Sequence, residues 1–296
     1  MNDRSKTIGS SEIAAIMGLN KYMTPIDVWK RKTSRAEEFE GNAATKRGLL
    51  LEPVVAEWFT QQTGIEVQLD QQPIKSDDYP CSATPDYLYN IDDKARGILE
   101  IKTTRFRVNA DDIPQSWFLQ AQYQAAVINQ SSIESPIEEI SLAWLDGDLV
   151  FGYTTFEVDD EYGQSLLNFA YDWWQRHIVQ DVMPDPSNAK EAAYKWPQHL
   201  ANKIEASDNL QSLVKSAKDL KLQISELEND LEEKTLLIKS IMQDAEAVVS
   251  GEDLLCTWKT SKGREKFDEK TFKAENEELY QKFCKPVPGN RVFLLK

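Results

Sequence analysis

Two short stretches of this chain hold side chains that could hydrolyse a phosphodiester together. Asp86 lies in residues 80–91, Glu100 and Lys102 lie in residues 97–104, and both stretches alternate apolar and polar residues as half-buried strands do. Residues two apart on a strand point to the same side, so Glu100 and Lys102 share one face. If the two strands pair as a hairpin, Asp86 comes close to Glu100. The spacing therefore predicts two carboxylates and one ammonium group on one small surface.

Each of these residue types has a role in metal-dependent hydrolysis. Mg²⁺ binds through one or two carboxylates and keeps several waters, so Asp86 and Glu100 would hold it, with the backbone carbonyl of Ile101 as a third ligand. Bound metal makes its water more acidic and neutralises charge on the phosphate, and Lys102 would orient or deprotonate that water. Leu99 and Ile101 would face the core. The same spacing also arises by chance on two exposed strands, so the triad alone does not establish this chemistry.

The composition describes a globular chain that stays in a reducing compartment. Its 296 residues are 41% hydrophobic and include eight Trp and eleven Phe, enough for one substantial domain plus an appendage. We expect neither a membrane span nor a signal peptide, and a cytoplasmic location. Cys81, Cys256 and Cys284 are far apart, which argues against a disulfide framework or a zinc site, and His177 and His199 are too isolated for a histidine-centred metal site.

The net charge of −15 argues against DNA binding unless basic residues are concentrated locally. Residues 1–50 hold nine Lys or Arg against six Asp or Glu, whereas residues 51–200 hold nine against twenty-five. The N-terminal segment is therefore expected to lie beside the site and to contact phosphates. Binding by such an acidic chain should weaken at high salt and without divalent metal.

Capping signals and hydrophobic periodicity predict an α/β core followed by a different C-terminal part. Helices are expected near 10–17, 25–32, 42–63, 114–128 and 160–180, with strands near 65–74, 80–91 and 97–104 and a hairpin over 138–158. Pro184 and Pro186 mark a boundary. We therefore expect a core over residues 1–185, a helical linker and coiled-coil arm over 186–250, and a small strand–helix–strand module over 251–296.

The arm carries apolar residues at alternating spacings of three and four, which is a heptad seam over about four repeats. A single lysine interrupts it at position 234. The seam residues are Leu213, Ala217, Leu220, Ile224, Leu227, Leu231, Ile238 and Ile241. The pattern fits a self-associating element, a partner dock and an intramolecular helical arm equally well, and we favour an arm or an oligomerisation element.

Five motifs in order make the first 180 residues or so resemble a known family. They are Ile8-Gly-Ser-Ser-Glu-Ile-Ala-Ala-Ile-Met-Gly18, Arg47-Gly-Leu-Leu-Leu-Glu-Pro53, Ser82-Ala-Thr-Pro-Asp86, Leu99-Glu-Ile-Lys-Thr-Thr104, and Ile113-Pro followed by Gln120-Ala-Gln122. Together they resemble the lambda-exonuclease-like YqaJ viral recombinases, a branch of the PD-(D/E)xK nucleases. The resemblance implies a restriction-endonuclease-like core in which helices flank a central mixed sheet.

The resemblance also implies a two-metal site for Mg²⁺, or alternatively Mn²⁺. Asp86 and Glu100 would bind the metals, Lys102 would be the catalytic lysine, Glu52 would complete the acidic cluster, and Gln120 would lie against the attacking water or the metal. Glu52 has an alternative reading as a surface carboxylate. Its helix is apolar around it, however, and a buried acid there needs a partner or a metal.

Further residues are assigned to DNA. Arg4 and Ser11 correspond to residues that would hold a terminal 5′ phosphate, and Ser10 beside Ser11 at a helix start would offer backbone N–H groups. Ser11 could instead be a simple helix cap. Gln122 and Arg105 are also expected at the DNA. Because Gln122 is two positions from Gln120, the two cannot share a helix face, so only Gln120 is expected to reach the reaction centre.

The function implied is a metal-dependent 5′-to-3′ double-strand DNA exonuclease that makes 3′ single-stranded tails for phage-type homologous recombination. It would act with a single-strand annealing protein, form a homo-oligomeric ring, and originate from a phage or prophage. Two alternatives use the same core: an endonuclease of restriction or repair type, and a catalytically silent DNA-binding protein.

Overall fold

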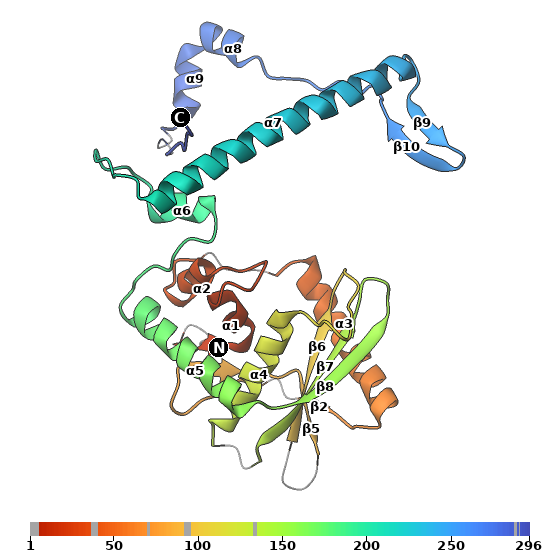
Figure 1. Cartoon of the computed structure of the whole chain (residues 1–296), viewed down its shortest axis with the longest axis vertical. Coiled ribbons are helices and arrows are strands. Elements are labelled where there is room, and N and C mark those ends of the chain that lie inside the picture. Colours follow the sequence, from red (N-terminus) through yellow and green to blue (C-terminus); the bar gives the residue numbers. More distant parts are fainter. Residues whose placement is uncertain are drawn as a thin grey trace. The chain divides into compact units, whose positions relative to one another are not determined.

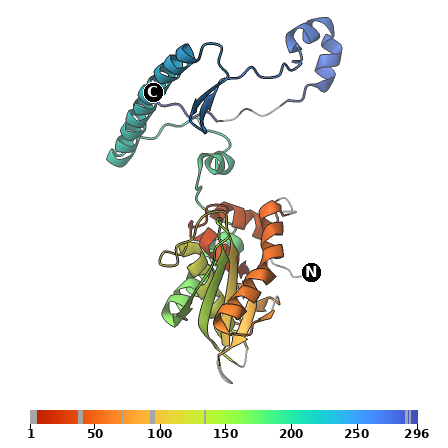
Figure 2. The ribbon, with the colours of Figure 1, turned by 90° about the vertical axis from the view of Figure 1, so that its right-hand side faces the viewer.

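The computed structural model describes residues 6–36, 41–69, 72–91, 96–132, 135–286, 289 and 291–296. The chain divides into two compact units, residues 1–196 and 197–296. Within the described ranges, no helix is both long and apolar enough to cross a bilayer. Figures 1 and 2 show the α/β organisation of the N-terminal unit and the long helix of the C-terminal unit.

A five-stranded mixed sheet forms the centre of the N-terminal unit, in the order β2-β5-β6-β7-β8. The β6–β7 pair is parallel, whereas β5 and β8 are antiparallel to their neighbours. The strands are β2 (Gln68–Leu69), β5 (Tyr87–Asn90), β6 (Arg96–Thr103), β7 (Ile137–Leu145) and β8 (Phe151–Glu157). This mixed sheet and its flanking helices confirm the predicted α/β fold class.

Helices cover both faces of this sheet (Figure 1). Two hydrophobic clusters show the packing: α1, α4 and α5 contribute to the cluster around Ile98 and Leu142, and α3 contributes to the cluster around Leu99 and Ala143. The helices of this unit are α1 (Ser10–Ile16), α2 (Pro25–Lys32), α3 (Ala43–Thr63), α4 (Gln115–Asn129), α5 (Asp160–Trp174), which continues as a π-helical turn (Gln175–Val179), and α6 (Ala189–Lys195).

The capping residues predicted from the sequence mark the boundaries of α2 and α3. The side chain of Thr24 caps α2 by accepting from the backbone N–H of Asp27, and Pro25 occupies the first helical position. The side chain of Asn42 caps α3, which ends at Gly64 with φ of 75°. Glycine adopts this left-handed conformation without a steric cost, so the helix stops there.

A small three-stranded sheet connects the segment before α1 with the segment before Asp86. In it β1 (Ile8–Gly9) pairs in parallel with β4 (Cys81–Ala83), which pairs antiparallel with β3 (Ile74–Lys75). The hydroxyl of Tyr123 on α4 donates to the carbonyl of Ile8 at 2.9 Å. The start of α1 is thereby held next to the segment that leads from β4 to Asp86.

The C-terminal unit contains one long helix, α7 (Asp208–Met242), as the heptad seam predicted. A hairpin of β9 (Ala247–Ser250) and β10 (Asp253–Thr257) follows, and then α8 (Glu269–Glu275) and α9 (Glu277–Phe283). The predicted strand–helix–strand order is wrong for this tail, because residues 291–296 form neither helix nor strand and β10 pairs with the preceding β9. Coiled-coil pairing of α7 stays a prediction.

Candidate active site

The hairpin of β5 and β6 brings Asp86 to the middle of the central sheet. Tyr87 is paired with Leu99, so Asp86, one residue before β5, lies opposite the centre of β6. The backbone N–H of Ile101 donates to Asp86 Oδ2 at 2.7 Å. This bond fixes the carboxyl group beside Glu100, which confirms the proximity that the hairpin predicted.

Alternation along β6 separates its core residues from its polar ones. Leu99 and Ile101 pack in the cluster that α3 covers. Glu100 and Lys102 contact side chains of α4 on the other face, as the period of two predicted. Glu100 is buried at 3% exposure, so its carboxylate requires polar partners.

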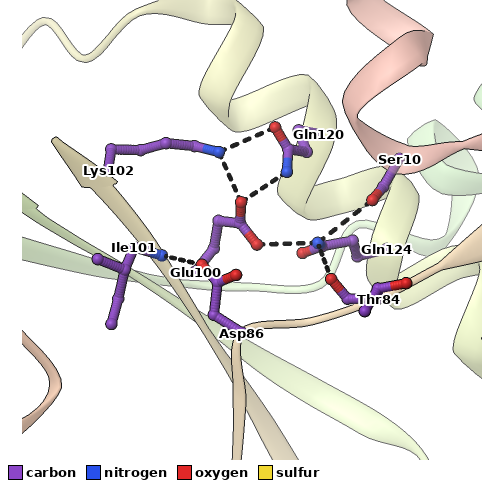
Figure 3. Close-up of polar contacts among 8 residues, drawn as sticks. All are labelled: Ser10, Thr84, Asp86, Glu100, Ile101, Lys102, Gln120 and Gln124. Carbon is purple, nitrogen blue, oxygen red and sulfur yellow. Dashed lines mark hydrogen bonds and ion pairs between the residues drawn. The ribbon is translucent and has the colours of Figure 1, made fainter. Parts of the chain in front are cut away.

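A connected group of side chains surrounds the Glu100 carboxylate (Figure 3). Lys102 Nζ donates to Glu100 Oε1 at 2.5 Å and to Gln120 Oε1 at 2.9 Å. Gln120 Nε2 donates to the same Glu100 oxygen at 2.5 Å. The ammonium group of Lys102 therefore faces the carboxyl group, and its position is set from two sides.

Gln124 is a residue of this group that the sequence analysis missed. Its Nε2 donates to Glu100 Oε2 at 2.8 Å and lies 3.4 Å from both Ser10 Oγ and the Thr84 carbonyl oxygen. The side chain is fully buried, and its Oε1 has no hydrogen-bond partner among the described residues. The spacing of four from Gln120 was the available signal, since residues four apart share a helix face.

These groups open onto a pocket of about 560 Å³. Asp86, Glu100 and Gln120 line it, together with Glu52 from α3 and a wall from the N-terminal segment that includes Arg31. The five residues predicted to carry the chemistry come from α3, the position before β5, β6 and α4. Four of them line this pocket, whereas Lys102 contacts two of those four, Glu100 and Gln120.

The surroundings of Glu52 differ from the prediction. Its side chain is half-buried rather than enclosed by its apolar helix, and the neighbouring Leu49 and Leu50 are 63% and 76% exposed. These leucines point to solvent because only one face of α3, with Val55 and Phe59, packs on the sheet. Glu52 is nonetheless close enough to raise the pKa of Asp86 electrostatically.

Burial raises the pKa of Asp86 to about 8, and repulsion from the Glu100 carboxylate adds to this effect. Lys102 and the Ile101 N–H lower that pKa, but they do not compensate. A carboxyl group in this setting keeps its proton at neutral pH unless another cation approaches. The site thus holds more negative charge than its own lysine neutralises.

The donor chemistry fits a divalent metal ion. Asp86, Glu100 and Glu52 supply hard carboxylate oxygens, which Mg²⁺ and Mn²⁺ prefer, and a cation bound among them would offset the repulsion that raises the pKa of Asp86. Within the described ranges, no three His, Cys, Asp or Glu side chains are already arranged as a preformed metal cluster. Glu100 Oε1 is instead held by Lys102 and Gln120.

Comparison with known proteins identifies the N-terminal part of the chain. Residues 1–131 match the family model of the YqaJ-like viral recombinase domain. The resemblance predicted from the five motifs is confirmed. This range includes the side chains described above around the pocket: Glu52, Asp86, Glu100, Lys102, Gln120 and Gln124.

Similarity to individual proteins extends further along the chain. The uncharacterized protein YqaJ of Bacillus subtilis (strain 168) is 28% identical over 308 residues, which cover 98% of this chain and 91% of that protein. Among solved structures, an alkaline exonuclease from Laribacter hongkongensis has 19% identity and a TM-score of 0.41. A phage related exonuclease from Haemophilus somnus 129PT has 12% identity and a TM-score of 0.42, and each likeness covers 60% of this chain and 96% of the other.

Gln122 of α4 does not reach the pocket. Its side chain is 1% exposed, donates to the carbonyl of Glu157 and accepts from the backbone N–H of Asp159. It therefore ties α4 to the connection between β8 and α5. The DNA contact predicted for Gln122 does not fit this geometry, because the amide has no solvent-facing surface.

The residues predicted to bind the 5′ end of DNA do not all lie in the same kind of place. Ser10 and Ser11 both line the pocket, Ser10 buried and Ser11 exposed. Neither serine is the cap of α1: Gly9 is the N-cap residue, and its N–H donates to Glu12 Oε2 at 2.8 Å. Arg4 lies outside the described residues.

Glu12 forms a largely buried ion pair with Lys32, with 2.6 Å between Glu12 Oε2 and Lys32 Nζ. Both residues belong to the N-terminal wall of the pocket, next to Arg31. The wall therefore includes basic residues from the segment in which the charge distribution predicted them.

Arg105 lies just beyond the end of β6. It is exposed and lines a smaller hollow of about 140 Å³ with Arg47 and Asp146. Gly147 packs against its backbone, and a Cβ at this glycine would lie 2.0 Å from the Arg105 carbonyl oxygen. Arg105 is therefore placed at the rim of the sheet and not in the pocket of Glu100.

Proposed function

We propose that this chain is a divalent-metal-dependent deoxyribonuclease. The observation that carries the proposal is the group formed by Asp86, Glu100, Lys102 and Gln120, which meets Glu52 at one pocket. The match to a viral recombinase domain supports DNA as the substrate. The basic residues in the N-terminal wall support binding of a phosphate chain by an otherwise acidic molecule.

Asp86 and Glu100 would hold the metal, with the Ile101 carbonyl and Glu52 completing the ligand set of a one- or two-metal site. A bound Mg²⁺ or Mn²⁺ supplies charge neutralisation at the scissile phosphate and a water of lowered pKa. Binding requires Asp86 to lose the proton that burial and Glu100 favour. The Ile101 N–H keeps this carboxylate oriented after the proton leaves.

Lys102 and Gln120 would position the attacking water. The Lys102 side chain is 19% exposed and is held at Glu100 Oε1 and Gln120 Oε1, so its ammonium lies where a nucleophile must approach the carboxylates. As an ammonium group, Lys102 would orient the water and stabilise the charge that develops on the phosphate; as a neutral amine, it would accept the proton of the water. Gln120 keeps the ammonium from turning away.

The proposed reaction proceeds 5′ to 3′ from the ends of double-stranded DNA and leaves 3′ single-stranded tails. Ser11 at the exposed start of α1 and Arg4 would hold the terminal 5′ phosphate, and Arg105 would contact the DNA backbone beyond the sheet. This polarity is the one that the family resemblance implies. The N-terminal wall of the pocket supports it, because Ser11 lines the same pocket as residues assigned to hydrolysis.

The proposed setting is phage-type homologous recombination in the bacterial cytoplasm. A single-strand annealing protein would receive the 3′ tails, and copies of the chain would assemble as a ring around the duplex. In this arrangement residues 1–185 form the nuclease core, and residues 186–250 and 251–296 provide the arm and the tail.

Digestion of a linear duplex labelled at either the 5′ or the 3′ end tests the proposal, with Mg²⁺ and Mn²⁺ in parallel reactions. Early release of the 5′ label, abolished by Lys102→Ala, is the expected result. Early release of the 3′ label would overturn the polarity. Cutting of covalently closed circular DNA would indicate an endonuclease. Equal inertness of the wild type and Lys102→Ala with both metals would indicate a silent DNA-binding protein.

A further inference from the structure

Helix α7 leaves almost its whole surface exposed. Of its 35 residues only Met242 is buried within the described structure, and Ser207 caps its start by accepting from the Leu210 N–H. At 1.5 Å per residue the helix is about 52 Å long. A helix of this length that buries no face against the described residues of its own unit depends on another surface for its stability.

The apolar residues of α7 form a continuous stripe, which we call the arm seam. It consists of Leu210, Leu213, Ala217, Leu220, Ile224, Leu227, Leu231, Lys234, Ile238 and Ile241. The spacing alternates between three and four along the whole helix, which is the pattern of a two-stranded coiled coil. Leu220, Leu227 and Leu231 are 55%, 67% and 67% exposed. Such a stripe predicts a second helix with the same repeat.

The single charged residue of the arm seam indicates the direction of that second helix. If two copies paired in parallel and in register, Lys234 would face Lys234 of the other copy, and the two ammonium groups would repel each other. If two copies pair antiparallel over their full length, Lys234 faces Ala217. Alanine is the smallest residue of the seam, so the lysine stem can lie across it while the ammonium reaches water.

The other layers of this antiparallel pairing are entirely apolar. Leu210 faces Ile241, Leu213 faces Ile238, Leu220 faces Leu231, and Ile224 faces Leu227, each contact occurring twice by symmetry. All ten seam positions have a partner in this register. A shift by one heptad in either direction would leave seam residues beyond the end of the other helix, so the full overlap buries the most apolar surface.

The charges beside the arm seam favour the same direction. The first half of the helix carries Lys215, Lys218 and Lys221 against two acids, Asp208 and Asp219. Residues 226–233 carry five acids and no base. Antiparallel pairing places Lys221 beside Glu228 of the other copy. Parallel pairing would instead place the two acidic segments side by side. Exposed pairs each contribute little, but repulsion between like charges selects against the parallel form.

We propose that the arm seam is a self-association surface on which a second copy of this chain binds antiparallel over the full length of α7. The interface is two-fold symmetric and uses the same residues on both copies. It brings two recombinase domains into one particle. The proposal rests on α7 alone, so its test is independent of the proposed nuclease activity.

Disulfide formation between single-cysteine positions in the full chain tests the direction. Leu213→Cys and Ile238→Cys are each introduced together with Cys256→Ser and Cys284→Ser, which remove the two native thiols that are not buried. In the antiparallel pair the two copies of position 213 lie about 38 Å apart, since 25 residues separate them along the axis. Mild oxidation of the mixed variants should give at least about tenfold more linked dimer than either variant alone, because facing thiols have a high effective concentration.

Linkage of Leu213→Cys to itself, with no excess in the mixture, would show a parallel pair and overturn the proposal. Absence of linked dimer from every combination would overturn it too, because α7 would then bind another protein or fold back on its own chain. These outcomes do not depend on whether the chain cleaves DNA.

Light scattering of the full chain provides a matched measurement of mass. Leu220→Asp places a charge in the arm seam, whereas Leu222→Asp places the same charge on the outer face of the same helix, at a leucine that is 61% exposed. Leu220→Asp should lower the particle mass about twofold, and Leu222→Asp should leave it unchanged. Equal masses for the two variants would contradict self-association through the seam.

Discussion

At the scale of single residues, the Glu100 carboxylate is the centre of the site. One of its oxygens accepts from Lys102 and Gln120, and the other accepts from Gln124. Three side chains from two elements therefore fix the orientation of one buried carboxylate. Such fixation keeps a ligand in place before a metal or substrate arrives, which lowers the reorganisation that binding requires.

Lys102→Ala should lower the rate of DNA cleavage by about 10² to 10⁴ while DNA binding persists, because it removes a proton acceptor and a stabilising charge. Single-turnover digestion of a linear duplex measures the loss. Lys30→Ala, at a half-buried lysine whose ammonium lies over the ring of Tyr194, serves as the matched control. A rate for Lys102→Ala equal to that of the control would remove this lysine from the reaction.

Asp86 gives a prediction for pH. Its pKa is raised to about 8 in the folded metal-free protein, so the folded state holds a proton that the unfolded state has already released. Between the ordinary value of an aspartic acid and about pH 8, this group makes the metal-free protein less stable as pH rises. Asp86→Asn should therefore raise the melting temperature of metal-free protein at pH 8.5, by about 3–8 °C.

The same shift makes metal binding pH-dependent. Binding of Mn²⁺ should tighten as pH rises from 6 towards 8 and release a proton, because the ligand must be deprotonated. Calorimetric titration in two buffers of different ionisation enthalpy measures the proton. Binding by wild type that is as tight at pH 6 as at pH 8, with no proton released, would contradict the assignment of Asp86.

Gln124 should act as a positioning residue for Glu100. Gln124→Leu removes the donor to Glu100 Oε2, and we expect metal affinity to fall by about 10–100-fold, the usual cost of losing a partner of a metal ligand. Gln122→Leu is the matched control on the same helix, since its amide contacts only the backbone at Glu157 and Asp159. If both variants lost metal affinity equally, the effect would come from altered packing of α4.

At the scale of elements, β6 determines where the chemistry lies. Leu99 and Ile101 pack on α3, whereas Glu100 and Lys102 contact α4, so one strand supplies both core and site. This arrangement requires close packing at Gly97, where a Cβ would lie 2.1 Å from the ring of Tyr89. The Tyr89 hydroxyl is itself bonded to Glu139 and Ser141, so the ring cannot move without breaking those bonds.

Gly97→Ala should therefore destabilise the N-terminal unit by about 1–3 kcal/mol, the usual cost of overpacking a core. Gly48→Ala is the comparison, because its nearest neighbour would be Thr103 Oγ1 at an ordinary 3.7 Å. Urea unfolding of the two variants measures the difference. Equal midpoints would show that the sheet accommodates the added methyl group.

The same elements show what the sequence could predict. Period-two alternation and the hairpin identified Glu100, Lys102 and Asp86 as neighbours, and capping residues located α2 and α3. Periodicity does not say which face of α4 meets the sheet, so Gln122 was assigned to DNA and Gln124 was overlooked. The exposed face of α3 and the irregular conformation of residues 291–296 depend on tertiary packing, which a local pattern does not contain.

At the scale of the whole molecule, the charge distribution shapes DNA binding. The net charge of −15 repels DNA, and basic residues such as Arg31 are concentrated in the N-terminal segment that lines the pocket. Contacts of this kind release counterions from DNA, so they weaken as salt rises.

Arg31→Ala should weaken binding to every duplex sequence similarly and reduce the slope of log affinity against log salt by about one. Fluorescence anisotropy between about 50 and 200 mM salt, without divalent metal, measures the slope. Arg107→Ala removes an exposed partner of Asp148 that does not line the pocket, so it should leave the slope unchanged. An unchanged slope for Arg31→Ala would place the DNA elsewhere.

The most direct measurement is the release of nucleotides from a linear duplex in Mg²⁺ by wild type and by Glu100→Gln. Wild type should degrade the duplex and stop when the metal is chelated. Glu100→Gln keeps the size of the side chain but loses its charge, so it should bind the same duplex and cleave it at least about 10³-fold more slowly. Degradation by Glu100→Gln at the wild-type rate, or by wild type after chelation, would contradict a metal-dependent site built on Asp86, Glu100 and Lys102.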